Sequence, residues 1–249
     1  MASSSQVRQS RRESLASQRL AAAQKERRNR IIFVSAGVVV LIIVIAVAVW
    51  GVMSAMTKGG NQTPPNATSG KDGIWLTHDN PDAPTLQVYS DYNCPNCKTA
   101  ELTLHQAMDD LAAAGAINIS THALAFEAAS SREAANAAAC ADAAGVFADY
   151  NYQLFLNQPS DGTGLTKTMM RETIPATISL TGDKLTEFQT CYDESAMGKF
   201  VDAEIKYAAD QKVTTTPSFI LDGKNITSEI YNTKTRSYDP DLLRSVVNG

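Results

Sequence analysis

The sequence predicts an α/β domain that contains an all-helical insertion and follows one transmembrane helix. Over residues 85–121, strand, helix and strand patterns succeed one another, which is the order of a parallel crossover unit. From about residue 128 to residue 210, apolar residues follow helical spacing with no strand pattern between them. Strand residues return only at Ser218–Leu221, and a turn, a partner strand and a helix complete the domain.

The predicted transmembrane helix comprises residues 31–52. Within it, residues 31–50 are twenty residues without a charge, enough to cross about 30 Å of hydrocarbon at about 1.5 Å per residue. Three arginines lie at residues 27–30 and only Lys58 follows on the other side, so the positive-inside rule places the N-terminus in the cytoplasm. A cleaved signal peptide is the alternative, but the basic region and the apolar run are both longer than usual for one.

Charge divides the chain at this segment. Residues 1–30 hold eight Lys or Arg against Glu13 and Glu26, whereas the whole chain has a formal net charge of −4. The two parts therefore face different environments. We expect residues 1–30 to form a basic cytoplasmic tail, and residues 53–249 to lie outside the cytoplasm, held at the cell membrane by the single-pass anchor.

A flexible linker is predicted for residues 53–73, because Gly59-Gly60 and Pro64-Pro65 occur there among several Asn, Thr and Ser residues. The folded domain then covers residues 74–249.

The first half of this domain reads as strand, strand, helix and strand. Residues 74–76 form a short strand, and residues 85–90 form a buried strand that ends at the turn of residues 91–93. Residues 97–111 carry apolar side chains at helical spacing, and residues 117–121 alternate as a strand. Asp91 in the turn is expected to serve as a solvated turn or cap residue rather than in proton transfer.

The insertion is expected to contain several helices, with a loop at residues 159–164 and a break at Pro175. After it, the strand at Ser218–Leu221 turns at Asp222-Gly223 toward a partner strand near Ile226. A helix over residues 239–247 ends the domain.

All four cysteines, Cys94, Cys97, Cys140 and Cys191, follow the membrane segment, as disulfide chemistry in an oxidising compartment would require. Cys94-Pro95-Asn96-Cys97 is a C-x-x-C motif at the start of the predicted helix, where the helix N-terminus lowers the pKa of a thiol. A redox-active dithiol is the favoured interpretation. A purely structural disulfide is one alternative.

A zinc site is the other chemistry that a C-x-x-C can serve. Zinc needs about four ligands, and the sequence offers neither a second C-x-x-C nor a His pair at matching spacing. His78, His105 and His122 show no ligand spacing and are expected at the surface or in packing. We therefore expect neither a metal nor another cofactor.

The chain resembles the DsbA-like thiol:disulfide oxidoreductases of the thioredoxin fold. Two stretches carry the resemblance, namely Val88–Cys97 (VYSDYNCPNC) and Val213–Gly223 (VTTTPSFILDG), and together with the helical insertion they extend it over nearly all of residues 74–249. The resemblance implies a thioredoxin fold with an all-helical insertion, of the membrane-anchored type that suits a cell envelope without a sealed periplasm, such as that of actinobacteria.

The resemblance and the chemistry of helix ends assign roles within the motif. Cys94 faces unpaired backbone N–H groups and is the expected attacking sulfur, and Cys97 would resolve the mixed disulfide. Pro95 suits the first helical turn, where its missing N–H costs nothing. Asn96 stands where many DsbA-like enzymes have His, so stabilisation of the thiolate by an imidazolium is absent from this motif.

Thr216 and Pro217 form the second half of the expected site. By the resemblance, Pro217 follows a cis peptide bond and packs beside the C-x-x-C motif, and Thr216 binds a Cys-containing substrate peptide in extended pairing. The alternative is an ordinary trans proline that begins an edge strand.

Cys140 and Cys191 both fall in the insertion, and a bridge that ties its helices together is the natural interpretation. Two buried free thiols are the alternative. A redox role for this pair is disfavoured, because neither cysteine has C-x-x-C spacing.

The expected function is formation of disulfide bonds in exported Cys-containing proteins, with a quinone-linked membrane protein as the reoxidising partner that the family implies. A reductase or isomerase is one alternative, and a non-catalytic thioredoxin-like binding module is another. Isomerases of this fold usually need a dimerisation module, and between the linker and the first strand there is no room for one. A monomer is expected. No nucleic acid is expected as a partner.

Overall fold

The computed structural model describes residues 60–70 and 73–249. The predicted cytoplasmic tail, residues 1–30, and the predicted transmembrane helix, residues 31–52, lie outside the described residues. In the described part of the chain, no helix is both long and apolar enough to cross a membrane. The tail and the anchor therefore stay predictions.

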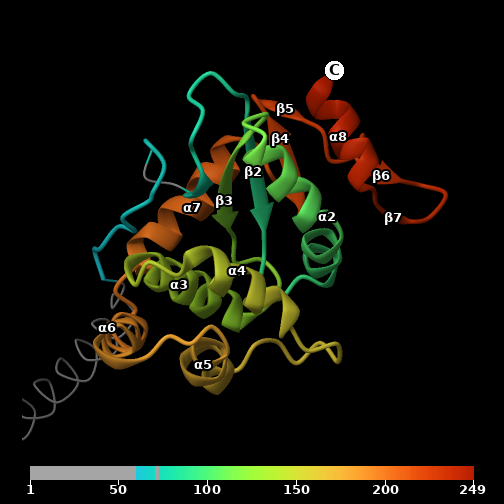
Figure 1. The fold of residues 1–249 in the computed structure, drawn as a ribbon. Helices are drawn as coiled ribbons and strands as arrows, with labels where there is room; N and C mark the ends of the chain where they lie inside the picture. The colour runs from blue at the N-terminus through green and yellow to red at the C-terminus, as the bar shows by residue number, and fades with distance from the viewer. Residues whose placement is uncertain (1–59, 71–72) are drawn as a thin grey trace, which may run out of the picture. The chain divides into compact units, whose positions relative to one another are not determined.

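A five-stranded sheet forms the centre of the domain, with strand order β1-β3-β2-β4-β5 (Figure 1). Strands β2 and β3 are parallel and helix α2 connects them, which confirms the predicted crossover unit. Strands β1, β4 and β5 run antiparallel to their neighbours. The bounds are β1 Ile74–Thr77, β2 Thr85–Ser90, α2 Pro95–Ala113, β3 Asn118–Ala123, β4 Ser218–Leu221 and β5 Lys224–Asn225.

Helices cover both faces of this sheet, because successive side chains of β2 point to opposite sides. Leu86 and Val88 pack with Leu104 of α2 and Leu243 of the C-terminal helix α8 (Pro240–Asn248). Tyr89 lies on the other face and packs with α7 (Gly198–Asp210). The end of β2, where the C-x-x-C motif follows, thus lies between two layers of helices.

Between β3 and β4 the described chain forms helices only, as predicted. Helix α3 packs against α4, α6 and α7, and Figure 1 shows α3, α4 and α6 beyond one end of the sheet, whereas α7 lies alongside it. A disulfide joins Cys140 of α3 to Cys191 of α6, with 5.8 Å between their Cα atoms. The bounds are α3 Ala129–Ala143, α4 Phe147–Leu156, a π-helical turn η1 Met169–Thr173, α5 Ile174–Thr177 and α6 Gly182–Asp193.

A second, two-stranded sheet precedes the last helix and was not predicted. It consists of β6 (Tyr231–Asn232) and β7 (Ser237–Tyr238), which pair antiparallel. Each strand has two residues, too few for an alternating pattern to be recognised in a sequence.

The structure corrects part of the predicted linker, residues 53–73. Residues 60–70 bind the helical insertion instead of forming a free tether. The Gly60 N–H donates to the Ser195 carbonyl oxygen at 2.8 Å. A Cβ atom at position 60 would lie 2.3 Å from backbone atoms of Ala196, so this glycine permits close approach of two backbones rather than flexibility.

Asn66 fixes the same segment a few residues further on. Its backbone N–H and its side-chain Nδ2 donate to the two carboxyl oxygens of Asp142, each at 2.8 Å. Asp142 is 2% exposed. Gly, Pro and Asn are common both in free linkers and in extended segments bound to a surface, so composition does not distinguish the two. Composition also does not reveal a hydrogen-bond partner 76 residues away.

We predict that Asn66→Ala lowers the free energy of unfolding by about 1–3 kcal/mol, because the buried Asp142 carboxyl group loses the side-chain Nδ2 donor, while the backbone N–H at position 66 remains. Urea unfolding of the full-length chain measures this change. The control is Asn61→Ala, an exposed position in the same segment, with an expected change within about 0.5 kcal/mol. Equal stability of the two variants would contradict stable binding of this segment.

Candidate active site

Both cysteines of the C-x-x-C motif lie at the N-terminus of α2. Cys94 is the N-cap residue with an extended backbone, and Pro95 takes the first helical position. Cys97 lies in the first turn, so both sulfur atoms are close to the unpaired backbone N–H groups of the helix start. The two residues are free cysteines in this structure and are 3% and 2% exposed.

The surroundings of Cys94 stabilise its thiolate. The pKa of Cys94 is lowered from an ordinary value of 9.0 to about 6, first by a hydrogen bond from the Cys97 thiol. The backbone N–H of Cys97, the Thr216 side chain and the backbone N–H of Asn96 act in the same direction, whereas burial opposes them. The Asn96 side chain is exposed, so this residue acts through its backbone.

Cys97 is held as a thiol. Burial is the largest cause that raises the pKa of Cys97, and the hydrogen bond and the negative charge of Cys94 add to it. The backbone N–H of Asp91 lies 3.5 Å from the Cys97 sulfur and lowers the pKa of Cys97, although less than burial raises it. The two sulfurs are therefore chemically unequal at neutral pH.

The Thr216–Pro217 loop meets the motif across 122 residues of sequence. The peptide bond between these residues is cis, the form that the resemblance implied. The Cys94 sulfur lies 3.6 Å from the backbone oxygen of Thr216. Pro217 directly precedes β4, and the pairing of β4 with β2 brings the two halves of the site together.

Asp91 differs from the predicted solvated turn residue, because it is completely buried. Its carboxyl group accepts hydrogen bonds from the Asn93 N–H, the Ser131 hydroxyl, the Phe126 N–H and the Glu127 N–H, at 2.7–2.9 Å. These donors lie in its own turn, in the loop after β3 and in the first turn of α3. The predicted turn is therefore an attachment point for the insertion.

The next residue of the turn, Tyr92, extends this attachment. The Tyr92 hydroxyl donates to Asn151 of α4 at 2.8 Å, and the side chain of Gln158 donates to the Tyr92 carbonyl oxygen at 2.8 Å. The Lys98 ammonium group, one residue after Cys97, donates to the carbonyl oxygen of Gln158 at 2.8 Å. Helix α4 and the segment after it are thus bound to both sides of the motif.

Asn93 completes the turn. Its side-chain oxygen accepts from the Leu165 N–H at 2.8 Å, and its Nδ2 donates to the hydroxyls of Ser130 and Ser131. A single side chain thereby joins the first turn of α3 to the loop before η1.

Tyr238 is a residue near the cysteines that the sequence analysis missed. Burial raises the pKa of Tyr238 to about 12, and the charges of Cys97 and Cys94 contribute to this shift. Its ring packs against Phe219 of β4 and Tyr231 of β6. The β6–β7 hairpin, which was not predicted, positions Tyr238. In the sequence, its signal is the pair Tyr231 and Tyr238 on the two sides of a polar turn.

His122 lies in packing, as predicted. It is fully buried in β3 and stacks on Tyr89 with 4.3 Å between the ring centroids. Burial lowers the pKa of His122 to about 3.

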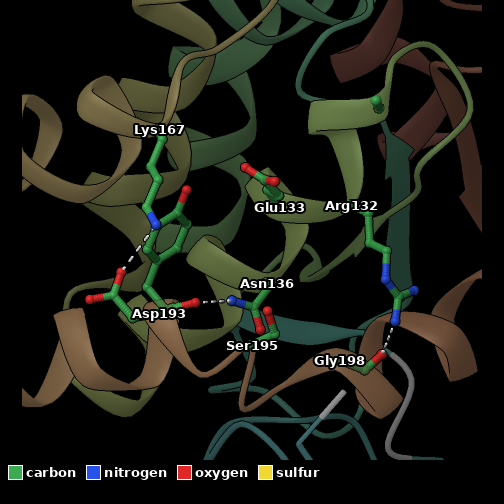
Figure 2. A pocket seen from close by; sticks show the side chains of 9 residues that line it. Arg132, Glu133, Asn136, Lys167, Asp193, Ser195 and Gly198 are labelled. Carbon is green, nitrogen blue, oxygen red and sulfur yellow. Dashed lines mark hydrogen bonds and ion pairs between the residues drawn. The ribbon is translucent and has the colours of Figure 1, made fainter. Parts of the chain in front are cut away.

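The helical insertion contains a separate cavity of about 400 Å³ that none of the predicted site residues line. Figure 2 shows Lys167 and Arg132 at its two sides, with Glu133 between them. Both cations are already engaged, Lys167 by Asp193 at 3.6 Å and Arg132 by Asp202. The Cys140–Cys191 disulfide lies within the insertion, where it joins α3 to α6.

The parallel β2–α2–β3 unit, the dithiol at the start of α2 and the opposed cis-proline loop define an α/β protein of the thioredoxin class. The thioredoxin family model matches residues 76–238. The chain therefore belongs to the thioredoxin family. No curated protein matches the chain.

Solved structures of DsbA-like proteins are similar to this chain in fold. BdbD from Bacillus subtilis is 22% identical, with a TM-score of 0.59 and coverage of 76% of this chain and 97% of that chain. MdbA from Actinomyces oris, a thiol-disulfide oxidoreductase, is 19% identical, with a TM-score of 0.62 and coverage of 76% and 91%. Reduced DsbA from Mycobacterium tuberculosis is 19% identical, with a TM-score of 0.54 and coverage of 71% and 91%. The resemblance to DsbA-like proteins is confirmed for the fold.

We predict that the reduced protein titrates a thiolate with a midpoint near pH 6, the pKa of Cys94. Absorbance of the thiolate at about 240 nm against pH measures it, and Cys94→Ala should remove the transition. Thr216→Val should raise the midpoint, because the Thr216 side chain lowers the pKa of Cys94.

The same shift predicts a pH dependence of stability. The pKa of Cys94 is lower in the folded state than the ordinary value of 9.0. The reduced protein should therefore gain stability over Cys94→Ala as pH rises from about 6 to about 9, and lose it as pH falls through 6. Urea unfolding at several pH values measures this difference, and a constant difference would contradict the shift.

Proposed function

We propose that this chain is an extracytoplasmic thiol:disulfide oxidoreductase that forms disulfide bonds in exported Cys-containing proteins. The observation that carries the proposal is the lowered pKa of Cys94 beside a buried thiol and the Thr216–Pro217 loop. Similarity in fold to the thiol-disulfide oxidoreductase MdbA and to DsbA supports it. A non-catalytic binding module would need neither an activated thiolate nor a loop opposite it.

The proposed reaction begins with the oxidised Cys94–Cys97 pair. A substrate thiolate attacks the Cys94 sulfur, the Cys94–Cys97 bond breaks, and Cys97 leaves with the electron pair. A second substrate thiolate then attacks the substrate sulfur of the mixed disulfide. The substrate gains its disulfide, Cys94 leaves as a thiolate, and the enzyme is left reduced by two electrons.

The direction of electron flow follows from the stability of the reduced enzyme. A thiolate with a pKa near 6 stabilises the reduced enzyme at neutral pH, and a stable reduced form makes the disulfide a strong oxidant. This favours an oxidase over a reductase or isomerase.

Thr216 and Pro217 are proposed to bind the substrate. They lie where β4 begins, beside the Cys94 sulfur, so the backbone of Thr216 is available for extended pairing with a peptide that carries the reacting cysteine. The proposed enzyme acts as a monomer at the membrane, held by residues 31–52, and a quinone-linked membrane protein reoxidises it.

We predict that the oxidised full-length chain restores activity to reduced ribonuclease A, because its disulfide accepts electrons from substrate thiols. Cys94→Ser should abolish this activity. Cys97→Ser should lose it too, because this variant cannot form the Cys94–Cys97 disulfide that accepts the electrons. With oxidised ribonuclease A, however, its Cys94 thiolate should attack a substrate disulfide and stay in a mixed disulfide, because Cys97 is no longer present to resolve it. Enzyme assay and non-reducing electrophoresis measure these outcomes.

The matched control is the double variant Cys140→Ala/Cys191→Ala, which keeps the motif and removes the other disulfide. It should retain oxidase activity. The equilibrium of the Cys94–Cys97 disulfide with glutathione tests the direction of electron flow. A reduction potential of about −120 mV indicates an oxidase, and one of about −270 mV indicates a reductase. Loss of activity in the double variant while the protein stays folded would contradict a purely structural second disulfide.

A further inference from the structure

Asp91 is a buried acidic residue that takes no direct part in the steps of the proposed reaction. It is completely buried, and its two carboxyl oxygens accept four hydrogen bonds. Oδ1 accepts from the Asn93 N–H at 2.8 Å and from the Ser131 hydroxyl at 2.7 Å. Oδ2 accepts from the backbone N–H groups of Phe126 at 2.7 Å and Glu127 at 2.9 Å.

This bonding restricts where the backbone of Asp91 can lie. All four partners are donors, so only a group with two acceptor oxygens can satisfy them together. The partners come from three segments, of which two are 35 to 40 residues further along the chain. A shift of Asp91 would therefore break several buried hydrogen bonds at once.

The backbone N–H of the same residue donates to the Cys97 sulfur at 3.5 Å. This contact favours a thiolate at Cys97, because the Asp91 N–H lowers the pKa of Cys97 against the larger opposing effect of burial. The Thr216 side chain acts in the same direction, whereas burial and Cys94 raise the pKa of Cys97.

A negative charge forms on Cys97 at one step of the proposed reaction. When a substrate thiolate attacks Cys94, the sulfur–sulfur bond breaks and the electron pair goes to Cys97, which then takes up one proton. The rate of such exchange rises as the leaving thiol becomes more acidic. A fixed donor aimed at the leaving sulfur lowers the barrier in the same way as a donor in an oxyanion hole.

We infer that Asp91 is a positioning residue, whose buried carboxyl group holds its own backbone N–H against the Cys97 sulfur to stabilise the thiolate that leaves during substrate attack. The inference rests on the proposed function for the identity of the step. The inferred contact changes the rate of the step and not its equilibrium constant. The reason is that the Cys97 sulfur, which the Asp91 N–H faces, is uncharged both in the disulfide and in the reduced pair.

The test is Asp91→Asn in the oxidised full-length chain. An amide replaces one acceptor oxygen by a donor, so the four hydrogen bonds cannot all be kept. The second-order rate constant for attack by reduced glutathione should fall about tenfold or more, the effect expected for a lost hydrogen bond to a charged group. The equilibrium constant with glutathione should change by less than about threefold, since charge on Cys97 is transient. Acid quenching and mass spectrometry measure both.

Asp142→Asn is the matched control. Asp142 is another buried carboxyl group, near the opposite end of α3, where it accepts two hydrogen bonds from Asn66. This variant should lose stability and keep the wild-type rate constant. The inference is overturned if Asp91→Asn reacts at the wild-type rate, if Asp142→Asn is slowed equally, or if the rate and equilibrium constants of Asp91→Asn fall in proportion.

Ser131→Ala covers the case in which Asp91→Asn does not fold. It removes one of the four donors to Asp91, the hydroxyl at 2.7 Å. A folded Ser131→Ala protein should react about two- to fivefold more slowly with an unchanged equilibrium constant, and a wild-type rate overturns the inference. If wild-type protein fails to oxidise ribonuclease A while these rate effects hold, the proposed function fails and the inference stands.

Discussion

Two thiols buried one helical turn apart can share one negative charge but cannot hold two, and the site is organised around this constraint. The hydrogen bond from the Cys97 thiol to the Cys94 sulfur is the largest cause that lowers the pKa of Cys94 to about 6. The same bond and the same burial raise the pKa of Cys97. Cys94 alone is therefore a nucleophile at neutral pH, and the order of the reaction steps follows from which sulfur is charged.

The helical insertion supports this arrangement through the turn before the motif. Asp91, Tyr92 and Asn93 are consecutive, and each binds a different set of groups in the insertion or the loop that leads to it. Helix α3 supplies Ser131 at its first turn and Cys140 near its end. The disulfide to α6 thus stabilises the helix that helps to fix the turn. The hydrogen bonds at the two sulfurs come from the motif itself, from Asp91 and from Thr216. The insertion therefore acts on the reaction by holding the backbone positions of these groups.

The sequence was sufficient for features that depend on local patterns. The parallel β2–α2–β3 unit, the helices between β3 and β4, and the placement of Cys94 at a helix start all follow from periodicity and from short motifs. The burial of Asp91 was not accessible, because its partners lie as many as 40 residues away and include backbone N–H groups. Tyr238 escaped for a different reason, since two-residue strands leave no periodic signal.

Asn96 bears on how the thiolate is stabilised. A histidine at this position would stabilise a thiolate only while protonated, below about pH 6.5. Here the stabilising groups are the Cys97 thiol, backbone N–H groups and the Thr216 side chain, none of which loses its effect as pH rises toward neutrality. Fixed dipoles of this kind act only at short range and in one geometry. The reactivity of Cys94 therefore depends on the position of the first turn of α2. The hydrogen bonds of the turn at residues 91–93 hold that position.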